Sequence, residues 1–149
     1  MDHKKMNEKN LVKVFFEWKD DDTLRSESLW AEGLDVDHFR LDNVPFFVYG
    51  VSYNDIVTTI IKEDNFFFKD VSERGGHSTL RVFFLSQDSN HQQELIENIN
   101  TLGGTIERAS ASHIAIDIPK NVKIEPIIDL LIMGEKEGLW EYEEGYIYK

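Results

Sequence analysis

Hydrophobic and polar residues alternate along most of the first half of the chain. This pattern is typical of strands that bury one face and expose the other. Strands are predicted over 11–18, 27–33, 38–43, 55–61 and 66–72. Lys62-Glu63-Asp64-Asn65 has turn-forming residue types, so the last two strands are expected to form a hairpin. The first half is therefore expected to be a small sheet or partial barrel.

The second half changes pattern, because apolar residues at helical spacing appear between strand-like runs. Strands are predicted over 77–86, 105–109, 113–118 and 139–148. One helix begins at Asp88 or Ser89 and ends at Gly103-Gly104, and a second begins at Glu125-Pro126. This order is that of the ferredoxin-like β-α-β-β-α-β unit, in which two helices cover one face of an antiparallel sheet. The fold class expected for the whole chain is α+β.

The chain divides at the change of pattern. We expect a flexible tail over residues 1–10, a β-rich subdomain over 11–75 and a ferredoxin-like subdomain over 76–149. The helix-free face of the second sheet needs a cover, and the first half is the nearest candidate; otherwise that face is a binding or dimer surface. Whether the halves form one domain or two is left open.

Composition narrows the function classes. The 149 residues carry a formal net charge of -12, which disfavours nucleic acid and anionic membranes and favours basic partners. Simple solubility explains the same charge equally well. There is no cysteine and no membrane-length apolar run, so we expect a cytoplasmic protein without disulfides, bound to no membrane. The oligomeric state is left open.

Donors suited to an anionic ligand gather at the start of the second half. They are Arg74, His77, Ser78, Thr79 and Arg81. The alternative is a linker and a strand whose arginine pairs locally. Tyr49 and Asp55, in the aromatic segment around Pro45, complete a candidate pocket, although that segment is equally explained as a packed connection between the halves.

Catalytic and metal-binding patterns are weak. His77 and Ser78 are adjacent in a strand and point to opposite faces, so an enzyme would have to pair His77 with Asp55 or a glutamate brought close by folding. The histidines lack metal-ligand spacing, and the loop carboxylates of residues 20–22, 35 and 37 lack the spacing of a calcium loop. We expect no enzyme activity, no metal and no cofactor.

The final strand alternates aromatic and acidic residues. Glu141 and Glu143 are expected on its solvated face, and with Glu144 they form a candidate acidic surface for a protein partner. The same pattern is also that of an ordinary solvated strand.

Four segments carry a resemblance to a known family. They are Leu29-Trp30-Ala31, RLDNVPFFVYGVS at residues 40–52 with Asp55, GHSTLRV at residues 76–82, and Trp140-Glu141-Tyr142-Glu143-Glu144. The chain resembles a family of short bacterial domains of unknown function from about Ser28 to Tyr146. The resemblance implies no activity and no catalytic residue.

Two functions are therefore expected ahead of an enzyme. The first is a protein-binding module, such as an immunity or antitoxin-like protein that neutralises a basic bacterial toxin through its acidic face. The alternative is a sensor that holds a small anionic ligand in the cleft between the halves.

Overall fold

A computed structural model describes residues 10–149 of the chain, so residues 1–9 of the expected flexible tail lie outside the described residues. The first half is a closed barrel of five strands in sequence order. These strands are β1 (Leu11–Asp20), β2 (Thr23–Gly33), β3 (His38–Leu41), β4 (Ile56–Lys62) and β5 (Asn65–Glu73). Neighbours pair antiparallel, and a short parallel pairing of β1 with β5 closes the barrel. The expected β-rich half is thus a complete barrel.

The barrel interior is filled by the apolar side of each alternating strand. Its buried side chains are Val14, Phe16, Leu29, Ala31, Phe39, Leu41, Val51 and Val57. The ring of Phe16 stacks on that of Phe68 with centroids 4.8 Å apart. Because each wall buries its alternate residues, the barrel holds a core of its own without the second half.

The second half follows the predicted order of strands and helices. Its elements are β6 (Ser78–Phe84), α2 (Ser89–Thr101), β7 (Thr105–Ser110), β8 (His113–Ile118), α3 (Glu125–Lys136) and β9 (Trp140–Tyr146). The four strands form one sheet in the order β7-β8-β6-β9, and every neighbouring pair is antiparallel. The chain is therefore an α+β protein with two sheets and two helices.

Local sequence signals mark the ends of both helices. The Asp88 side chain accepts a hydrogen bond from the backbone N–H of Asn90 and caps α2, which Gly103 follows with φ +104°. Pro126 occupies the first turn of α3, where a missing N–H costs nothing, and Gly138 follows the helix with φ +75°. Local sequence thus sets the helix boundaries.

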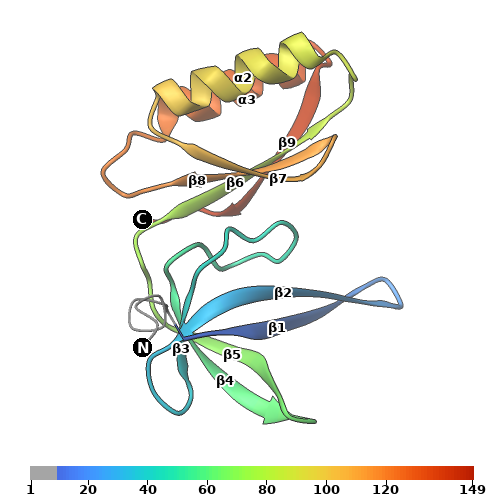
Figure 1. The fold of residues 1–149 in the computed structure, drawn as a ribbon. Helices are drawn as coiled ribbons and strands as arrows, with labels where there is room; N and C mark the ends of the chain where they lie inside the picture. The colour runs from blue at the N-terminus through green and yellow to red at the C-terminus, as the bar shows by residue number, and fades with distance from the viewer. Residues whose placement is uncertain (1–9) are drawn as a thin grey trace, which may run out of the picture.

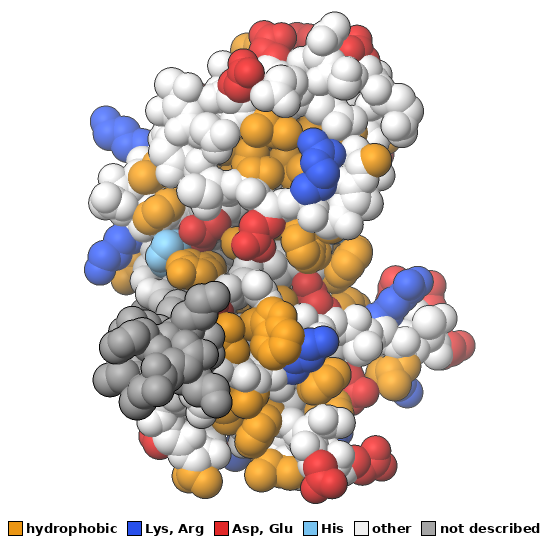
Figure 2. All heavy atoms as spheres, viewed as in Figure 1, with side chains coloured by type: hydrophobic (Ala, Val, Ile, Leu, Met, Phe, Trp, Pro, Cys, Tyr) orange, Lys and Arg blue, Asp and Glu red, His pale blue; other side chains and the backbone are white. Residues whose placement is uncertain are grey.

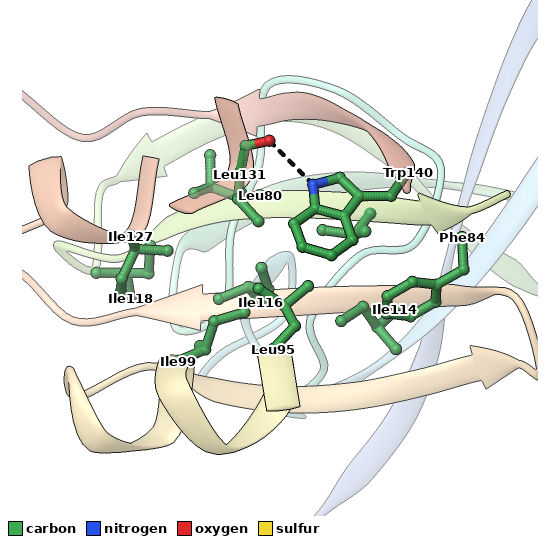
Figure 3. Close-up of a cluster of buried hydrophobic side chains, with 11 residues drawn as sticks. Leu80, Phe84, Leu95, Ile99, Ile114, Ile116, Ile118, Ile127, Leu131 and Trp140 are labelled. Carbon is green, nitrogen blue, oxygen red and sulfur yellow. Dashed lines mark hydrogen bonds between the residues drawn. The ribbon is translucent and has the colours of Figure 1, made fainter. Parts of the chain in front are cut away.

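The helices pack on one face of the second sheet and enclose the second core. Trp140 lies in this core, and its Nε1–H donates to the carbonyl of Leu131 in α3 at 2.9 Å (Figure 3). The other labelled side chains come from strands β6 and β8 and from both helices (Figure 3). No helix in the described part of the chain has the length and apolar character needed to cross a membrane.

The opposite face of the second sheet is turned toward the barrel. The long connection between β3 and β4 runs between the two halves (Figure 1). The hairpin of β1 and β2 extends to the side (Figure 1). The expectation that the first half covers the helix-free face is confirmed by the hydrogen bonds between this connection and β6.

Gly134 tests the packing of α3 against the second sheet. A Cβ atom added there would lie 1.9 Å from the buried Trp140 ring, so the ring or the helix must move. Glycine to alanine in a helix normally stabilises by about 1 kcal/mol, but overpacking costs about 1–3 kcal/mol. We expect Gly134→Ala to lower the free energy of unfolding in urea. The control is Lys136→Ala at the exposed end of α3, which should change the free energy of unfolding by less than about 0.5 kcal/mol. A Gly134→Ala variant more stable than the wild type would contradict this packing.

Candidate functional site

The residues that the sequence singles out meet where the two halves touch. We call this surface the junction: the loop of residues 42–55 on one side, and the barrel-facing side of β6, β8 and β9 on the other (Figure 1). Strand alternation places Thr79, Arg81 and Phe83 of β6 on this side, because Leu80, Val82 and Phe84 enter the core under the helices.

Arg81 is the centre of the junction. Its side chain is fully buried, and its Nε–H donates to Glu143 Oε2 of β9 at 2.7 Å. Nη1 donates to the carbonyls of Pro45 (3.3 Å) and Val48 (2.9 Å), and Nη2 to that of Phe47 (3.2 Å). A buried guanidinium needs such partners, because an unpaired charge in the interior is costly.

The loop is held from its other side by Glu27 of β2. Its carboxylate accepts the backbone N–H groups of Phe46 at 2.7 Å, Phe47 at 3.1 Å and Val48 at 2.9 Å. The barrel therefore binds backbone N–H groups of the loop, while the second sheet binds backbone carbonyls of the loop. Glu27 is a functional residue of the junction that sequence reasoning missed, since nothing local distinguishes it from other strand glutamates.

Tyr49 extends the same cluster to the surface. Its hydroxyl donates to Glu143 Oε1 at 2.8 Å, and its ring centroid lies 4.8 Å from the Arg81 guanidinium carbon. Burial first, and then the hydrogen bond to Glu143, raises the pKa of Tyr49. Since 61% of this residue is exposed, its ring is the part of the cluster that a partner can reach.

The buried Asp55 pairs with the partly exposed Arg74 at the end of the loop. Asp55 is fully buried and accepts the N–H of Ser52 (2.9 Å) and of Gly75 (2.8 Å), together with Arg74 Nη1 (3.1 Å). Arg74 also donates to the Gly50 carbonyl at 2.7 Å. Glycine is needed at position 75, because a Cβ there would lie 2.4 Å from the Asn54 carbonyl oxygen.

Ser78 and Thr79 lie on opposite faces of β6. Thr79 Oγ1 is buried and lies 2.7 Å from Ser52 Oγ across the junction. Ser78 Oγ accepts the Tyr148 N–H at 2.9 Å on the helix-covered side. The candidate residues on the barrel side thus meet as predicted, but their polar groups already bind one another. Their role in binding an anionic ligand stays a prediction.

His77 pairs with Asp117 of β8, and not with Asp55. Its Nδ1 lies 2.9 Å from Asp117 Oδ1, and the Tyr53 ring packs edge-on at 5.1 Å. Burial raises the pKa of Asp117, and the neighbouring His77 opposes this. The pairing of His77 with Asp55 or a glutamate that an enzyme would require is not found; Asp117 becomes the neighbour of His77 only through the β6–β8 pairing.

A groove of about 410 Å³ opens beside this pair. It is lined by Asp42, Val44, Tyr53, Thr105, Ile106, Glu107 and Asp117. Figure 2 shows a histidine side chain beside carboxylates at the waist of the molecule. The groove is therefore acidic. The pair of histidine and aspartate resembles the base and its orienting group in general acid–base catalysis.

His113 of β8 lies in an aromatic cluster at the junction. Its ring stacks on Phe83 with centroids 4.2 Å apart, and the rings of Phe46 and Phe47 meet it edge-on. Nε2 is buried without a hydrogen-bond partner among the described residues. Burial lowers the pKa of His113, as does the charge of Arg81, while Glu143 and Glu27 act in the opposite direction. Burial therefore favours the neutral form of the imidazole.

The three glutamates of the candidate partner surface are separated. Glu141 is exposed on the barrel-facing side of β9, whereas Glu143 on the same side is bound to Arg81 and Tyr49. Glu144 is exposed and lines a hollow with residues of α3. They therefore form no single stripe, and their role in partner binding stays a prediction.

One histidine and two aspartates form a cluster at the turn between β2 and β3, outside the junction. His38 Nδ1 lies 2.9 Å from Asp35 Oδ1 and 3.0 Å from Asp37 Oδ1. The hydrogen bond to Asp35 raises the pKa of His38 and lowers that of Asp35. Asp35 also accepts the N–H groups of residues 37 and 38, so the turn itself accounts for the cluster.

Arg81→Met tests whether the guanidinium joins the two halves. The variant keeps apolar volume but leaves Glu143 and the loop carbonyls without their donor. Breaking a buried pair costs about 3–5 kcal/mol, and we expect a loss of unfolding free energy of that size in urea. Arg40→Met is the control, since its half-exposed pair with Glu32 should contribute less than about 1 kcal/mol. Equal losses in both variants would contradict the central role of Arg81.

His113→Phe tests the buried neutral imidazole. A lowered pKa means that the unfolded chain binds the proton more readily, so stability falls as pH drops below the ordinary histidine value of 6.5 toward the lower folded pKa. The raised pKa of His38 has the opposite effect, because its contribution to the stability of the fold is lost as pH rises. We expect His113→Phe to stay within about 1.5 kcal/mol of the wild type at pH 7 and to lose less stability on acidification. An unchanged pH dependence would contradict this account.

Comparison with known proteins agrees with the resemblance found in the sequence. The crystal structure of a hypothetical protein from Neisseria gonorrhoeae is similar in fold, with a TM-score of 0.83 and 18% sequence identity over 93% of this chain and 96% of that one. No match is found among curated proteins. Residues 27–142 match the domain of unknown function DUF4265. Because this match covers most of the chain, including the junction, the protein belongs to the DUF4265 family.

Proposed function

We propose that this protein is a non-enzymatic binding module for a basic protein. The most concrete form is an immunity or antitoxin-like protein that covers a basic bacterial toxin. The observation that carries the proposal is the distribution of charge. The positive groups with the best geometry for binding anions, the arginines, bind acceptors of the chain itself, and many carboxylates face solvent.

All five arginines of the chain bind acceptors of the chain itself. Arg74 and Arg81 bind Asp55 and Glu143 at the junction. The other three bind at the surface: Arg25 to Asp20, Arg40 to Glu32, and Arg108 to the carbonyls of residues 110 and 111. Arginine is the side chain best suited to hold phosphate or carboxylate through two hydrogen bonds. Because the arginines bind acceptors of the chain itself, the acidic groups dominate the chemistry of the surface.

The helix layer carries a large share of the exposed negative charge. Its carboxylates are Glu94, Glu97, Glu125, Asp129, Glu135 and Glu137. None of them forms an ion pair with another residue of the described chain, and Lys136 is the one cation within α2 and α3. Figure 2 shows red side chains over this layer at the top of the molecule. Such a surface speeds encounter with a basic protein.

The alternative proposal, a sensor for a small anionic ligand in the junction, has less support. Arg74 and Arg81 would have to release the carboxylates and carbonyls that they bind, at the cost of buried unpaired groups. The groove beside His77 is lined by Asp42, Glu107 and Asp117, whose charges repel an anion. Binding of a basic protein does not require the arginines to release their partners, and the groove carboxylates would attract it.

Three finer assignments accompany the proposal. We propose a ferredoxin-like unit over residues 76–149, supported by the antiparallel order β7-β8-β6-β9 under two helices. Separate subdomains at 11–75 and 76–149 are supported by two distinct buried cores. A cytoplasmic location is supported by the absence of cysteine.

Charge reversal on α2 tests the function. Glu94→Lys with Glu97→Lys should slow association with the basic protein encoded by the neighbouring gene by about tenfold at low salt, because the local field that attracts it is reversed. The association rate of the wild type should also fall as salt rises, since screening shortens the range of the attraction. Stopped-flow or biolayer measurements give both rates.

The matched control is Asp70→Lys with Glu73→Lys on β5. Both residues are exposed, and the pair changes the net charge by the same amount on the barrel. We expect a smaller effect, within about threefold. Equal slowing in both pairs would show that net charge matters but not the helix layer, and the absence of any complex with a basic neighbour would contradict the function.

A further inference from the structure

A groove lies on the helix layer, away from the junction. It is lined by His91, Glu94, Leu95 and Asn98 of α2, by Leu130, Met133 and Gly134 of α3, and by Glu137, Leu139 and Trp140. Its volume is about 280 Å³. Pockets that enclose small ligands usually have about 300–1,000 Å³, so the groove suits a protruding side chain better than a whole metabolite.

The floor of the groove is apolar and open to solvent. Met133, in the last turn of α3, is 60% exposed. Leu95 and Trp140 beneath it are buried in the core, so the floor is rigid. Methionine is flexible and polarisable and is common at surfaces that bind protein segments. The groove is therefore pre-formed, and Met133 can adjust to an inserted side chain.

The rim of the groove is acidic. Glu94 borders it on the α2 side, and Glu137 borders it just after α3. Neither carboxylate forms an ion pair with any residue among 10–149. His91 belongs to the rim as well, and its Nδ1 lies 3.6 Å from Asp88 Oδ2, so it adds no unopposed positive charge. An apolar floor between carboxylates complements an apolar side chain flanked by lysine or arginine.

We propose that this groove between α2 and α3 is the docking site for a basic amphipathic segment of the protein partner. A large apolar side chain of that segment, such as leucine or phenylalanine, inserts over Met133. Lysine or arginine on either side of it pairs with Glu94 and Glu137. The inference rests on the proposed function and adds the site and the chemistry of the partner. In this mode of binding the apolar contact provides most of the affinity, and the carboxylates make the site specific for a basic partner. Attraction by the net charge of the surface alone would need no such groove.

The experiment uses the full chain and three synthetic peptides. The first is an amphipathic helical peptide of leucine and lysine, the second has glutamate in place of lysine, and the third has serine in place of leucine. Affinity is measured by fluorescence anisotropy, and the labelled methyl group of Met133 is followed by NMR. We expect the first peptide to bind and to shift the Met133 signal, and the other two to bind at least about tenfold more weakly.

Met133→Lys is the decisive variant, since it places a positive charge on the floor at an exposed position that does not disturb the core. It should weaken the first peptide about tenfold or more. Val36→Lys is the matched control, because it adds the same charge at a residue that is 84% exposed in the loop between β2 and β3. It should change the affinity less than about twofold.

The outcomes distinguish a failure of the docking site from a failure of the proposed function. Equal affinity for the leucine and serine peptides, or equal weakening by the two lysine variants, overturns the groove and leaves attraction to basic partners standing. Binding of the glutamate peptide as tightly as the lysine peptide overturns the basic partner as the occupant. No binding of either basic peptide at low salt overturns both the groove and the proposed function.

Discussion

The structure depends on how the loop of residues 42–55 is held between the two halves. The Glu27 carboxylate takes three of its N–H groups from the barrel side, and the buried Arg81 guanidinium takes three of its carbonyls from the sheet side. Backbone without regular secondary structure can be buried only where its polar groups find such partners. Two opposite charges, one from each half, therefore convert an irregular loop into an interior layer.

This arrangement explains why the junction resembles a binding site in the sequence. Arginine and histidine beside glycine are also residues with which proteins bind anions. Here the anions are the protein's own carboxylates, Asp55 and Glu143, and the remaining acceptors are backbone carbonyls. The cost of burying the charges is offset within the fold, which leaves the exposed carboxylates of the helix layer to meet a partner.

The acidic helix layer and the junction are separated by the second sheet. A partner bound at the groove between α2 and α3 would contact the core through Leu95 and Trp140, both on the far side of that sheet from Arg81. The proposed binding site and the contact between the two halves thus lie on different faces of one four-stranded sheet. Alternation along β6 makes this possible, since Leu80 and Arg81 point to opposite sides.

The sequence alone determined the elements and their order. Period-two alternation, Pro126 and Gly103 place the strands and helix ends correctly, because these signals are local. Tertiary structure alone decided barrel closure, the pairing of His77 with Asp117, the part played by Glu27 and the position of Met133 over a groove. Each depends on residues far apart in the chain, and only the sheet register brings them together. Local spacing carries no information about such neighbours, so the candidate residues could be named from the sequence but not their partners.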